Sequence, residues 1–264
     1  MTVDPPAAIV DALRAGTLDA ELAGLLWLLA EGGAPIVVAG PGSTPVDMAR
    51  RTAVLAAMLD LVPADRRRVS LAGPAEDFAW LADAEALGWR RTLPAAEVPL
   101  DPARTVLLAG ELGVGPPADT IADRARLVIR ALGRGFGFGA TIEASRLEEV
   151  FDRLRARPIG LTDDELSRLG VVIVLGPVEG DAPPRIAAAH YVRPLARDVH
   201  GHPQRLPPAV LATWDGRAGR FEHFAWGAAA ELAERIGRRT GDFEAERERR
   251  AEALGGSPAG RPAG

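Results

Sequence analysis

Short, almost wholly apolar runs that alternate with helical segments constrain the fold of this chain more than any other feature. Three such runs are Pro35–Ala39, Thr105–Ala109 and Val171–Leu175. A strand that is apolar along its length is buried on both faces, as strands are in a parallel sheet covered by helices on both sides. Between the first two runs, Asp47–Val62 carries apolar residues at helical spacing. The sequence therefore predicts an α/β fold, with a mostly parallel sheet flanked by helices.

The other segments extend this alternation along the chain. Helices are expected at about Asp19–Glu31, Asp47–Val62, Glu76–Leu87, Ala118–Leu132, Arg146–Arg155, Ala228–Arg239 and Asp242–Leu254, and further strands at Arg68–Ala72 and Ala140–Glu143. Antiparallel strands or hairpins are expected at Arg185–Leu195 and Val210–Phe224, which with the last helices form a small β-hairpin and helical C-terminal portion. We expect an N-terminal lead over residues 1–18, one α/β domain over residues 19–254, and a disordered tail over residues 255–264.

Composition excludes several classes of function. The 264 residues carry a net charge of −5, from 36 acidic and 31 basic side chains, so no large cationic surface for nucleic acid is expected. Every basic residue is arginine, and the chain has no cysteine. A protein without lysine has no Schiff-base amine and no phosphate-loop lysine, and one without cysteine has no disulfide or thiolate metal site.

The chain also lacks the pattern of a membrane or secreted protein. Its start has no cationic region followed by an apolar run, and the longest apolar stretch, Leu22–Ala30, is too short to span a bilayer. We therefore expect a cytoplasmic protein without a membrane span.

A glycine turn follows the first apolar strand, where a phosphate-binding loop would lie. Residues 40–47 read GPGSTPVD, against the signature G-x-x-x-x-G-K-S/T. Pro45 stands where the second glycine belongs, Val46 where the lysine belongs, and Asp47 where the Mg²⁺-binding hydroxyl belongs. These changes remove an N–H donor, remove a cation and add a negative charge. The candidate anion-binding residues of this degenerate loop are Gly40, Gly42, Ser43 and Thr44. An ordinary strand-to-helix turn is the simpler interpretation.

The segment Gly135–Leu175 resembles the hexameric ATPases of type II secretion, type IV secretion and type IV pilus assembly. In that family a T-G-H-x-G segment is followed by a T-I-H-A-x-S strand end, a helix like EEALDRL and a return strand; here the segment begins GFGFGATIEASRLEEVFDRL. The resemblance extends more weakly over Leu25–Leu254, and Val106–Glu111 (VLLAGE) is similar to the Walker B strand. It implies a P-loop NTPase fold with a RecA-type core.

The motifs of that family are incomplete in this chain. The acidic box has lost its carboxylates at Ala72 and Gly73 and retains only Glu76; Phe136 and Glu143 replace the two histidines. Only Glu111 remains, aligned with the carboxylate that polarises the attacking water in active members. One carboxylate without a phosphate cradle does not support phosphoryl transfer, because that reaction depends on positioning and charge neutralisation.

The leading hypothesis is a degenerate, non-hydrolysing homologue that acts as a structural or regulatory component of a secretion or pilus machine and needs no cofactor. The resemblance implies an active secretion or pilus ATPase, an inner-membrane platform protein, or further copies of the chain as partners. One alternative is an atypical ATPase using ATP and Mg²⁺, with Arg50 or Arg51 supplying the phosphate charge and Glu111 the catalytic carboxylate. Another is a generic protein-binding or small-molecule-binding module on the same scaffold.

Three further patterns are weaker. His200 and His202 would need a third metal ligand, such as His190, Asp198 or His223, but glycine and proline flank them, so we expect an exposed loop and no metal site. Ser43 and Ser145 lie in no G-x-S-x-G nucleophile elbow. The glycines at 133, 135, 137 and 139 precede a strand and do not follow one, which argues against a dinucleotide fingerprint.

Overall fold

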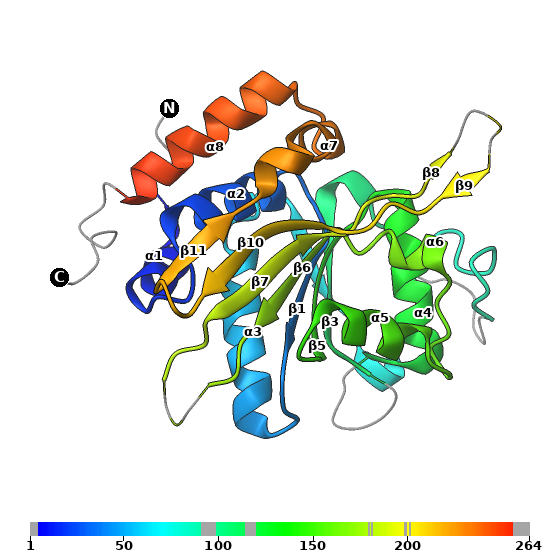
Figure 1. The fold of residues 1–264 in the computed structure, drawn as a ribbon. Coiled ribbons are helices and arrows are strands. Elements are labelled where there is room, and N and C mark those ends of the chain that lie inside the picture. The colour runs from blue at the N-terminus through cyan, green and yellow to red at the C-terminus, as the bar shows by residue number, and fades with distance from the viewer. Residues whose placement is uncertain are drawn as a thin grey trace.

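Helices cover both faces of one large sheet in the computed structural model of the chain, which describes residues 5–90, 99–113, 120–178, 180, 182–197, 200 and 202–255 (Figure 1). The helices are α1 (Ala7–Arg14), α2 (Ala20–Glu31), α3 (Pro45–Leu59), α4 (Ala122–Ala131), α5 (Leu147–Arg155), α6 (Asp163–Leu166), α7 (Ala229–Arg235) and α8 (Thr240–Gly255). The strands are β1 (Ile36–Gly40), β2 (Arg67–Ser70), β3 (Thr105–Gly113), β4 (Thr120–Ile121), β5 (Gly137–Glu143), β6 (Val171–Leu175), β7 (Ile186–Tyr191), β8 (Ala196–Arg197), β9 (Pro203–Gln204), β10 (Ala209–Asp215) and β11 (Arg220–His223).

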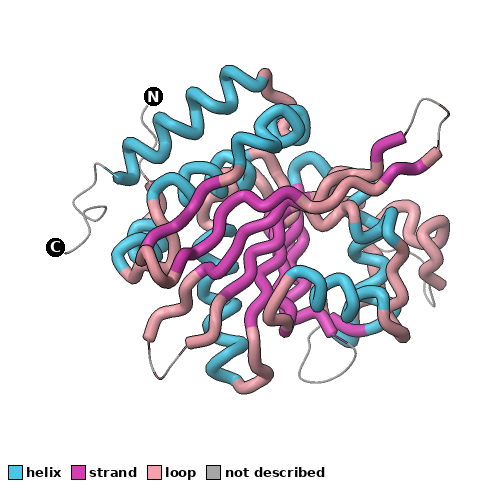
Figure 2. The backbone as a smooth tube through the Cα atoms, viewed as in Figure 1, coloured by secondary structure: helices cyan, strands magenta, loops and turns pink. Residues whose placement is uncertain are grey.

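The strand order confirms the predicted fold class. Among the described residues, the large sheet has the order β11-β10-β7-β6-β1-β5-β3-β2, with β4 paired to the end of β3. The neighbours from β6 to β2 are parallel, and β7, β10 and β11 run antiparallel. Figure 2 shows the strands side by side in the middle of the molecule, with helices around them. The protein is therefore a mostly parallel α/β sheet flanked by helices, extended by an antiparallel C-terminal portion.

Alternate residues of the central strand face two separate cores. Ile36 and Val38 of β1 pack with α2, α3 and α8, whereas Val37 and Ala39 pack on the opposite side with α4 and α5. Side chains alternate between the faces of a strand, so a central strand must be apolar at every position when helices cover both faces. This explains the continuous apolar runs of the sequence.

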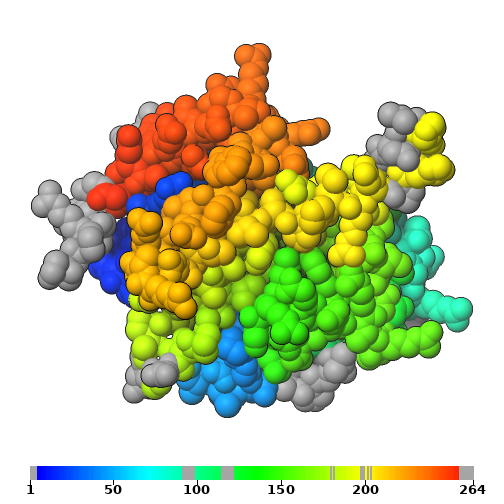
Figure 3. Space-filling model, viewed as in Figure 1, coloured from blue at the N-terminus to red at the C-terminus, as the bar shows by residue number. Residues whose placement is uncertain are grey.

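The C-terminal portion covers the N-terminal helices. Helix α8 lies across α2, and the space-filling view shows the red α8 over the blue N-terminal segment (Figure 3). The close approach depends on Gly24 of α2, where an added Cβ would lie 2.9 Å from the backbone nitrogen of Ala251. The β8–β9 hairpin extends away from this body on the other side (Figure 3).

Several predicted boundaries differ from the structure. Residues 76–87 form turns instead of the expected α-helix, preceded by a single 3-10 turn at Gly73–Ala75. Glu76 accepts hydrogen bonds from the Ala72 and Phe78 backbone nitrogens and from Trp80 Nε1, and Phe78 has a φ of 58°. These side-chain bonds compete with helical ones, and the positive φ interrupts a right-handed helix.

The ends of the predicted domain fall partly on described residues. The predicted lead contains α1, whose Ile9 is buried in the same core as α2, so this helix packs onto the domain that follows it. Gly255 ends α8, and the remainder of the predicted tail lies outside the described residues. The division at residue 19 and the disorder of the tail stay predictions. Within the described ranges, no helix combines the length and apolar character needed to cross a bilayer.

Candidate functional site: the loop after β1

The carboxyl ends of three neighbouring parallel strands meet beside the loop after β1, residues 40–47. In the sheet register, Gly40 at the end of β1 lies opposite Glu143 of β5, and Glu111 of β3 lies opposite Thr141 of β5. Crevices at the carboxyl ends of parallel strands are the usual ligand sites of α/β sheets. The fold therefore brings together the loop and two of the positions that the sequence singles out, Glu111 and Glu143.

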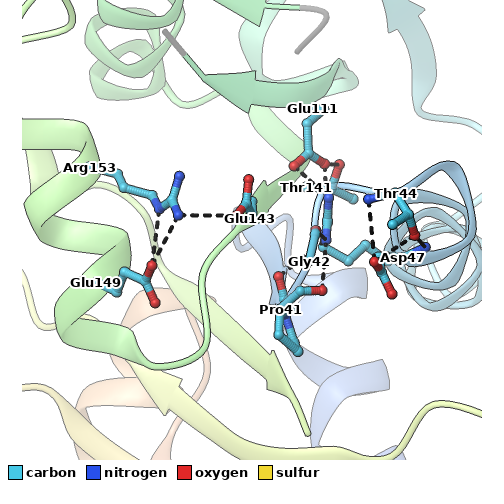
Figure 4. A network of polar contacts seen from close by, with 11 residues as sticks. Pro41, Gly42, Thr44, Asp47, Glu111, Thr141, Glu143, Glu149 and Arg153 are labelled. Carbon is cyan, nitrogen blue, oxygen red and sulfur yellow. Dashed lines mark hydrogen bonds and ion pairs between the residues drawn. The ribbon is translucent and has the colours of Figure 1, made fainter. Parts of the chain in front are cut away.

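The turn from β1 into α3 is closed by a capping box. The hydroxyl of Thr44 accepts a hydrogen bond from the Asp47 backbone nitrogen at 3.2 Å, and Asp47 Oδ2 accepts from the Thr44 backbone nitrogen at 3.3 Å and from Thr44 Oγ1 at 2.6 Å (Figure 4). These bonds occupy two N–H donors at the helix start, and Pro45 at the first helical position supplies none.

The Asp47 carboxylate also lies over the glycine of the loop. Gly42 has a φ of 81°, and a Cβ built there would be 2.2 Å from Asp47 Oδ2. The hydrogen bond from the Thr44 hydroxyl, helped by the charges of Arg50 and Arg51, holds the pKa of Asp47 below its usual value. The carboxylate is therefore ionised at neutral pH and stands as a fixed negative charge at the mouth of the loop.

A buried arginine fills the space beneath the loop. Nη1 of Arg51 donates to the carbonyl oxygens of Gly40 at 3.1 Å and Gly42 at 2.7 Å. Its Nη2 and Nε donate to the two carboxylate oxygens of Glu111, at 2.8 and 3.2 Å. Arg51 is 1% exposed and Glu111 is 5% exposed. Two opposite charges in fork-to-fork contact and away from water form a strong, specific pair.

Glu111 is held from a second side as well. The hydroxyl of Thr141 donates to Glu111 Oε2 at 2.5 Å, and Figure 4 shows the two side chains meeting above Pro41 and Gly42. The sequence aligns Glu111 with a carboxylate that polarises water, and that role stays a prediction. In the structure β3 continues to Gly113, so Glu111 lies within the strand and is buried and ion-paired.

The second candidate cation is also engaged. Arg50 forms an ion pair with Asp47 at 3.5 Å and donates through Nη2 to the carbonyl oxygen of Gly180. A small cavity, bounded by Gly40, Pro41, Asp47, Arg50 and Arg51 together with part of the chain after β6, has a volume of only about 20 Å³. That volume holds about one water molecule.

Glu143 and Phe136, which the sequence analysis compares with two histidines, make contacts within the fold. Glu143 pairs with Arg153 at 3.3 Å, and Arg153 also pairs with Glu149 at 3.0 Å, an arrangement visible beside the loop in Figure 4. Phe136 lies at the opposite end of β5, buried against Trp80 with ring centroids 5.4 Å apart. Neither side chain takes part in the contacts of Arg51.

The remaining predicted positions are spread over the molecule. Ser43 and Val46 are exposed in the loop and at the start of α3, with Val46 at 58% exposure. His200 and His202 are exposed on the β8–β9 hairpin, with ring centroids 6.2 Å apart. The three further ligands considered lie elsewhere: His190 is on β7, His223 contacts Asp19, and Asp198 is outside the described residues. No three or more potential metal ligands converge within the described part of the chain.

Sequence reasoning missed the Arg51–Glu111 pair. A signal for it exists in the periodicity of α3, because Arg51 shares the buried face of the helix with Val54, Leu55 and Met58. Arginine is almost never fully buried without a partner, so an arginine at such a position requires an acidic partner. The partner is 60 residues away in the chain, and only the packing of α3 against β1 and β5, next to β3, identifies it as Glu111.

Comparisons with known proteins place the chain far from characterised relatives. No protein-family model matches it, and no curated protein is significantly similar in sequence. Among solved structures, it is similar to the VirB11 ATPase of the type IV secretion system of Brucella suis, solved in complex with sulphate, with a TM-score of 0.41 and 20% sequence identity. The match covers 63% of this chain and 52% of that one, so this chain corresponds to about half of the length of its structural neighbour.

Proposed function

We propose that this protein is a P-loop-like scaffold that neither binds nor hydrolyses nucleoside triphosphates, and that it serves in the cytoplasm as a structural or regulatory component of a secretion or pilus machine. The observation that carries the first part is the pairing of Arg51 with Glu111 beneath the loop. The second part rests on the motif resemblance of Gly135–Leu175 to secretion and pilus ATPases.

The groups of the loop that a nucleotide would have to contact are already bonded to charged side chains of this chain. A phosphate cradle offers backbone N–H groups and a cation to the incoming anion. In this loop the Thr44 N–H is bonded to the Asp47 carboxylate, and the Arg51 guanidinium is turned inward onto loop carbonyls and Glu111. An incoming triphosphate would meet the Asp47 carboxylate, to which Arg50 is already paired, and would find no lysine.

The carboxylate expected to activate water is also held in place. Glu111 receives hydrogen bonds from Arg51 and Thr141, and these occupy both of its carboxylate oxygens. A general base must reach the proton that it removes, directly or through one water. Breaking a buried ion pair to free Glu111 would leave Arg51 uncompensated, which costs about 3–5 kcal/mol. This argues against the atypical ATPase with Arg51 as the phosphate cation.

Calorimetric titration with ATP and Mg²⁺ tests the proposal. We expect no binding by the wild-type protein at millimolar ATP. A variant carrying Pro45→Gly, Val46→Lys and Asp47→Thr restores the glycine, cation and hydroxyl of the signature, and we expect it to gain measurable affinity. Pro45→Ala serves as the matched control because it changes the loop without adding a cation. Saturable binding by the wild-type protein would refute the proposal.

The role in a machine has a separate test. A scaffold that lacks a nucleotide site acts through its surfaces, and the resemblance points to an active secretion or pilus ATPase, an inner-membrane platform protein, or another copy of the chain as the partner. A neighbouring gene for an intact ATPase or platform protein, and co-purification of that product with this chain, would support this role. Isolation from such genes would favour a generic binding module.

A further inference from the structure

We propose that a second cavity, between α4 and residues 87–90, binds a small phosphorylated metabolite. The cavity has a volume of about 320 Å³ and lies on the α4 side of the sheet, on the opposite face from α3. Its wall includes Leu87, Trp89, Arg90, Asp123, Arg126 and Arg130. Ligand sites for small molecules begin at about 300 Å³, so this cavity is large enough for a compact metabolite.

The charge of the wall selects for anions. Three arginines line the cavity, and Asp123 is the single carboxylate among its lining residues. Arg126 and Arg130 are four positions apart on α4, so their guanidinium groups lie on one helix face. The Asp123 carboxylate, 3.4 Å from Arg126, is 73% exposed, and water therefore screens it. A phosphate group between the guanidinium groups would gain charge-assisted hydrogen bonds.

Backbone contacts hold two of the arginines in position before any ligand arrives. Arg126 donates to the carbonyl oxygens of Pro158 and Ile159, and Arg130 donates to that of Leu87 at 2.8 Å. Carbonyl oxygens fix a guanidinium without cancelling its formal charge. Glu165 forms an ion pair with Nε of Arg130 at 2.5 Å. This carboxylate neutralises Arg130 and does not pair with Arg126 or Arg90. Held side chains lose less entropy on binding a ligand.

The backbone of the opposite wall is shaped to approach Arg130 closely. Gly88 has a φ of 98°, and a Cβ there would lie 3.1 Å from Arg130 Nη1. Next to it, Trp89 is half-buried, packed edge-on against Phe78 with ring centroids 4.9 Å apart. With Leu87 and the buried Leu127, Trp89 gives the cavity an apolar side. A ligand with a phosphate at one end and an organic ring at the other matches both surfaces.

Calorimetry at constant ionic strength, with AMP, glucose 6-phosphate, adenosine and glucose as probes, tests this inference. We expect the two phosphates to bind and the two parent compounds not to bind. Arg90→Gln and Arg126→Gln should each weaken AMP binding about tenfold, a change of about 1.4 kcal/mol. Arg217→Gln, an exposed residue of the β10–β11 turn, is the matched control and should leave binding unchanged.

The outcomes separate cleanly. Loss of AMP binding in both cavity variants, with unchanged circular dichroism and normal binding by Arg217→Gln, supports the site. Failure of both phosphates to bind at millimolar concentration overturns it, and so does binding that the cavity variants do not weaken. AMP binding that Val46→Glu abolishes while the cavity variants retain it would move the site to the loop after β1, and would thereby refute the cavity instead of supporting it.

Discussion

The geometry of the loop after β1 is set by a few side chains. Asp47 faces the loop mouth, Val46 faces solvent, and Arg51 faces inward to Glu111. The substitutions at 45–47 are visible in the sequence, and they predict a loop that has lost its cation. The inward arginine depends on tertiary packing, because its partner lies on another strand. The sequence therefore indicates that the loop lacks a lysine, and the structure adds that Arg51, paired with Glu111, fills the space beneath the loop.

A double-mutant cycle measures the buried pair. Glu111→Leu leaves the Arg51 guanidinium buried without a counter-charge and is expected to lower the free energy of unfolding by about 3–5 kcal/mol. Adding Arg51→Met removes the orphaned charge, so the double variant should be more stable than the Glu111→Leu protein. Urea unfolding followed by tryptophan fluorescence gives both values.

An exposed ion pair provides the reference value for the loss of stability in Glu111→Leu. Asp11 and Arg14 on α1 are 72% and 61% exposed, and Asp11→Ala should cost less than about 1 kcal/mol. If Glu111→Leu cost no more than this control, the pair would not be a buried charge pair in solution, and the description of the site would be wrong.

Most individual elements were predictable, and the main failure has a local cause. A short apolar run such as Val171–Leu175 predicts a strand that is buried on both faces. Strand β6 covers the same residues. Residues 76–87 were expected to be helical from their apolar spacing, but the Glu76 carboxylate captures donors within its own turn. The spacing of apolar residues does not show that Glu76 will accept these hydrogen bonds. In sequence, a glutamate of a helix cannot be told from a glutamate that caps a turn.

One contact between elements should respond to pH. His223 at the end of β11 lies 2.9 Å from Asp19, the N-cap of α2, and 3.7 Å from Glu21, while Arg247 of α8 faces Glu21 at 4.0 Å. Burial by itself lowers the pKa of His223, but the hydrogen bond and charge of Asp19, with the charge of Glu21, raise it overall above 6.5. The contact therefore stabilises the fold fully below pH 6.5 and is lost as the pH rises through the raised pKa.

Thermal unfolding of His223→Gln tests this contact. The stability advantage of the wild-type protein over the variant should be larger by about 0.5 kcal/mol at acidic than at alkaline pH, a modest value because Asp19 is partly exposed. His190→Gln is a matched control for which the opposite pH dependence is expected. Burial, partly offset by the charge of Glu148, lowers the pKa of His190. The wild-type protein should therefore lose stability relative to this variant as the pH falls. An advantage for His223 that does not change with pH would contradict the raised pKa.

At the scale of the whole molecule, the sheet and its two helical layers do not depend on the residues of any one site. The strand order and the two cores are set by apolar residues spread over the sheet, whereas the contacts at the loop after β1 depend on a few polar ones. A chain can therefore keep this architecture while the loop after β1 changes its chemistry. The C-terminal portion, with α8 lying across α2, covers the N-terminal layer at the end of the molecule away from the loop after β1 (Figure 1).

The central claim is that this architecture operates without nucleotide hydrolysis, and release of inorganic phosphate from ATP in the presence of Mg²⁺ tests it most directly. The account predicts that the purified protein releases no more phosphate than buffer does. Val46→Glu is the matched variant, because Val46 is 58% exposed and a charge there alters the loop without entering the core. Phosphate release that persists through successive purification steps and disappears in Val46→Glu would contradict the account.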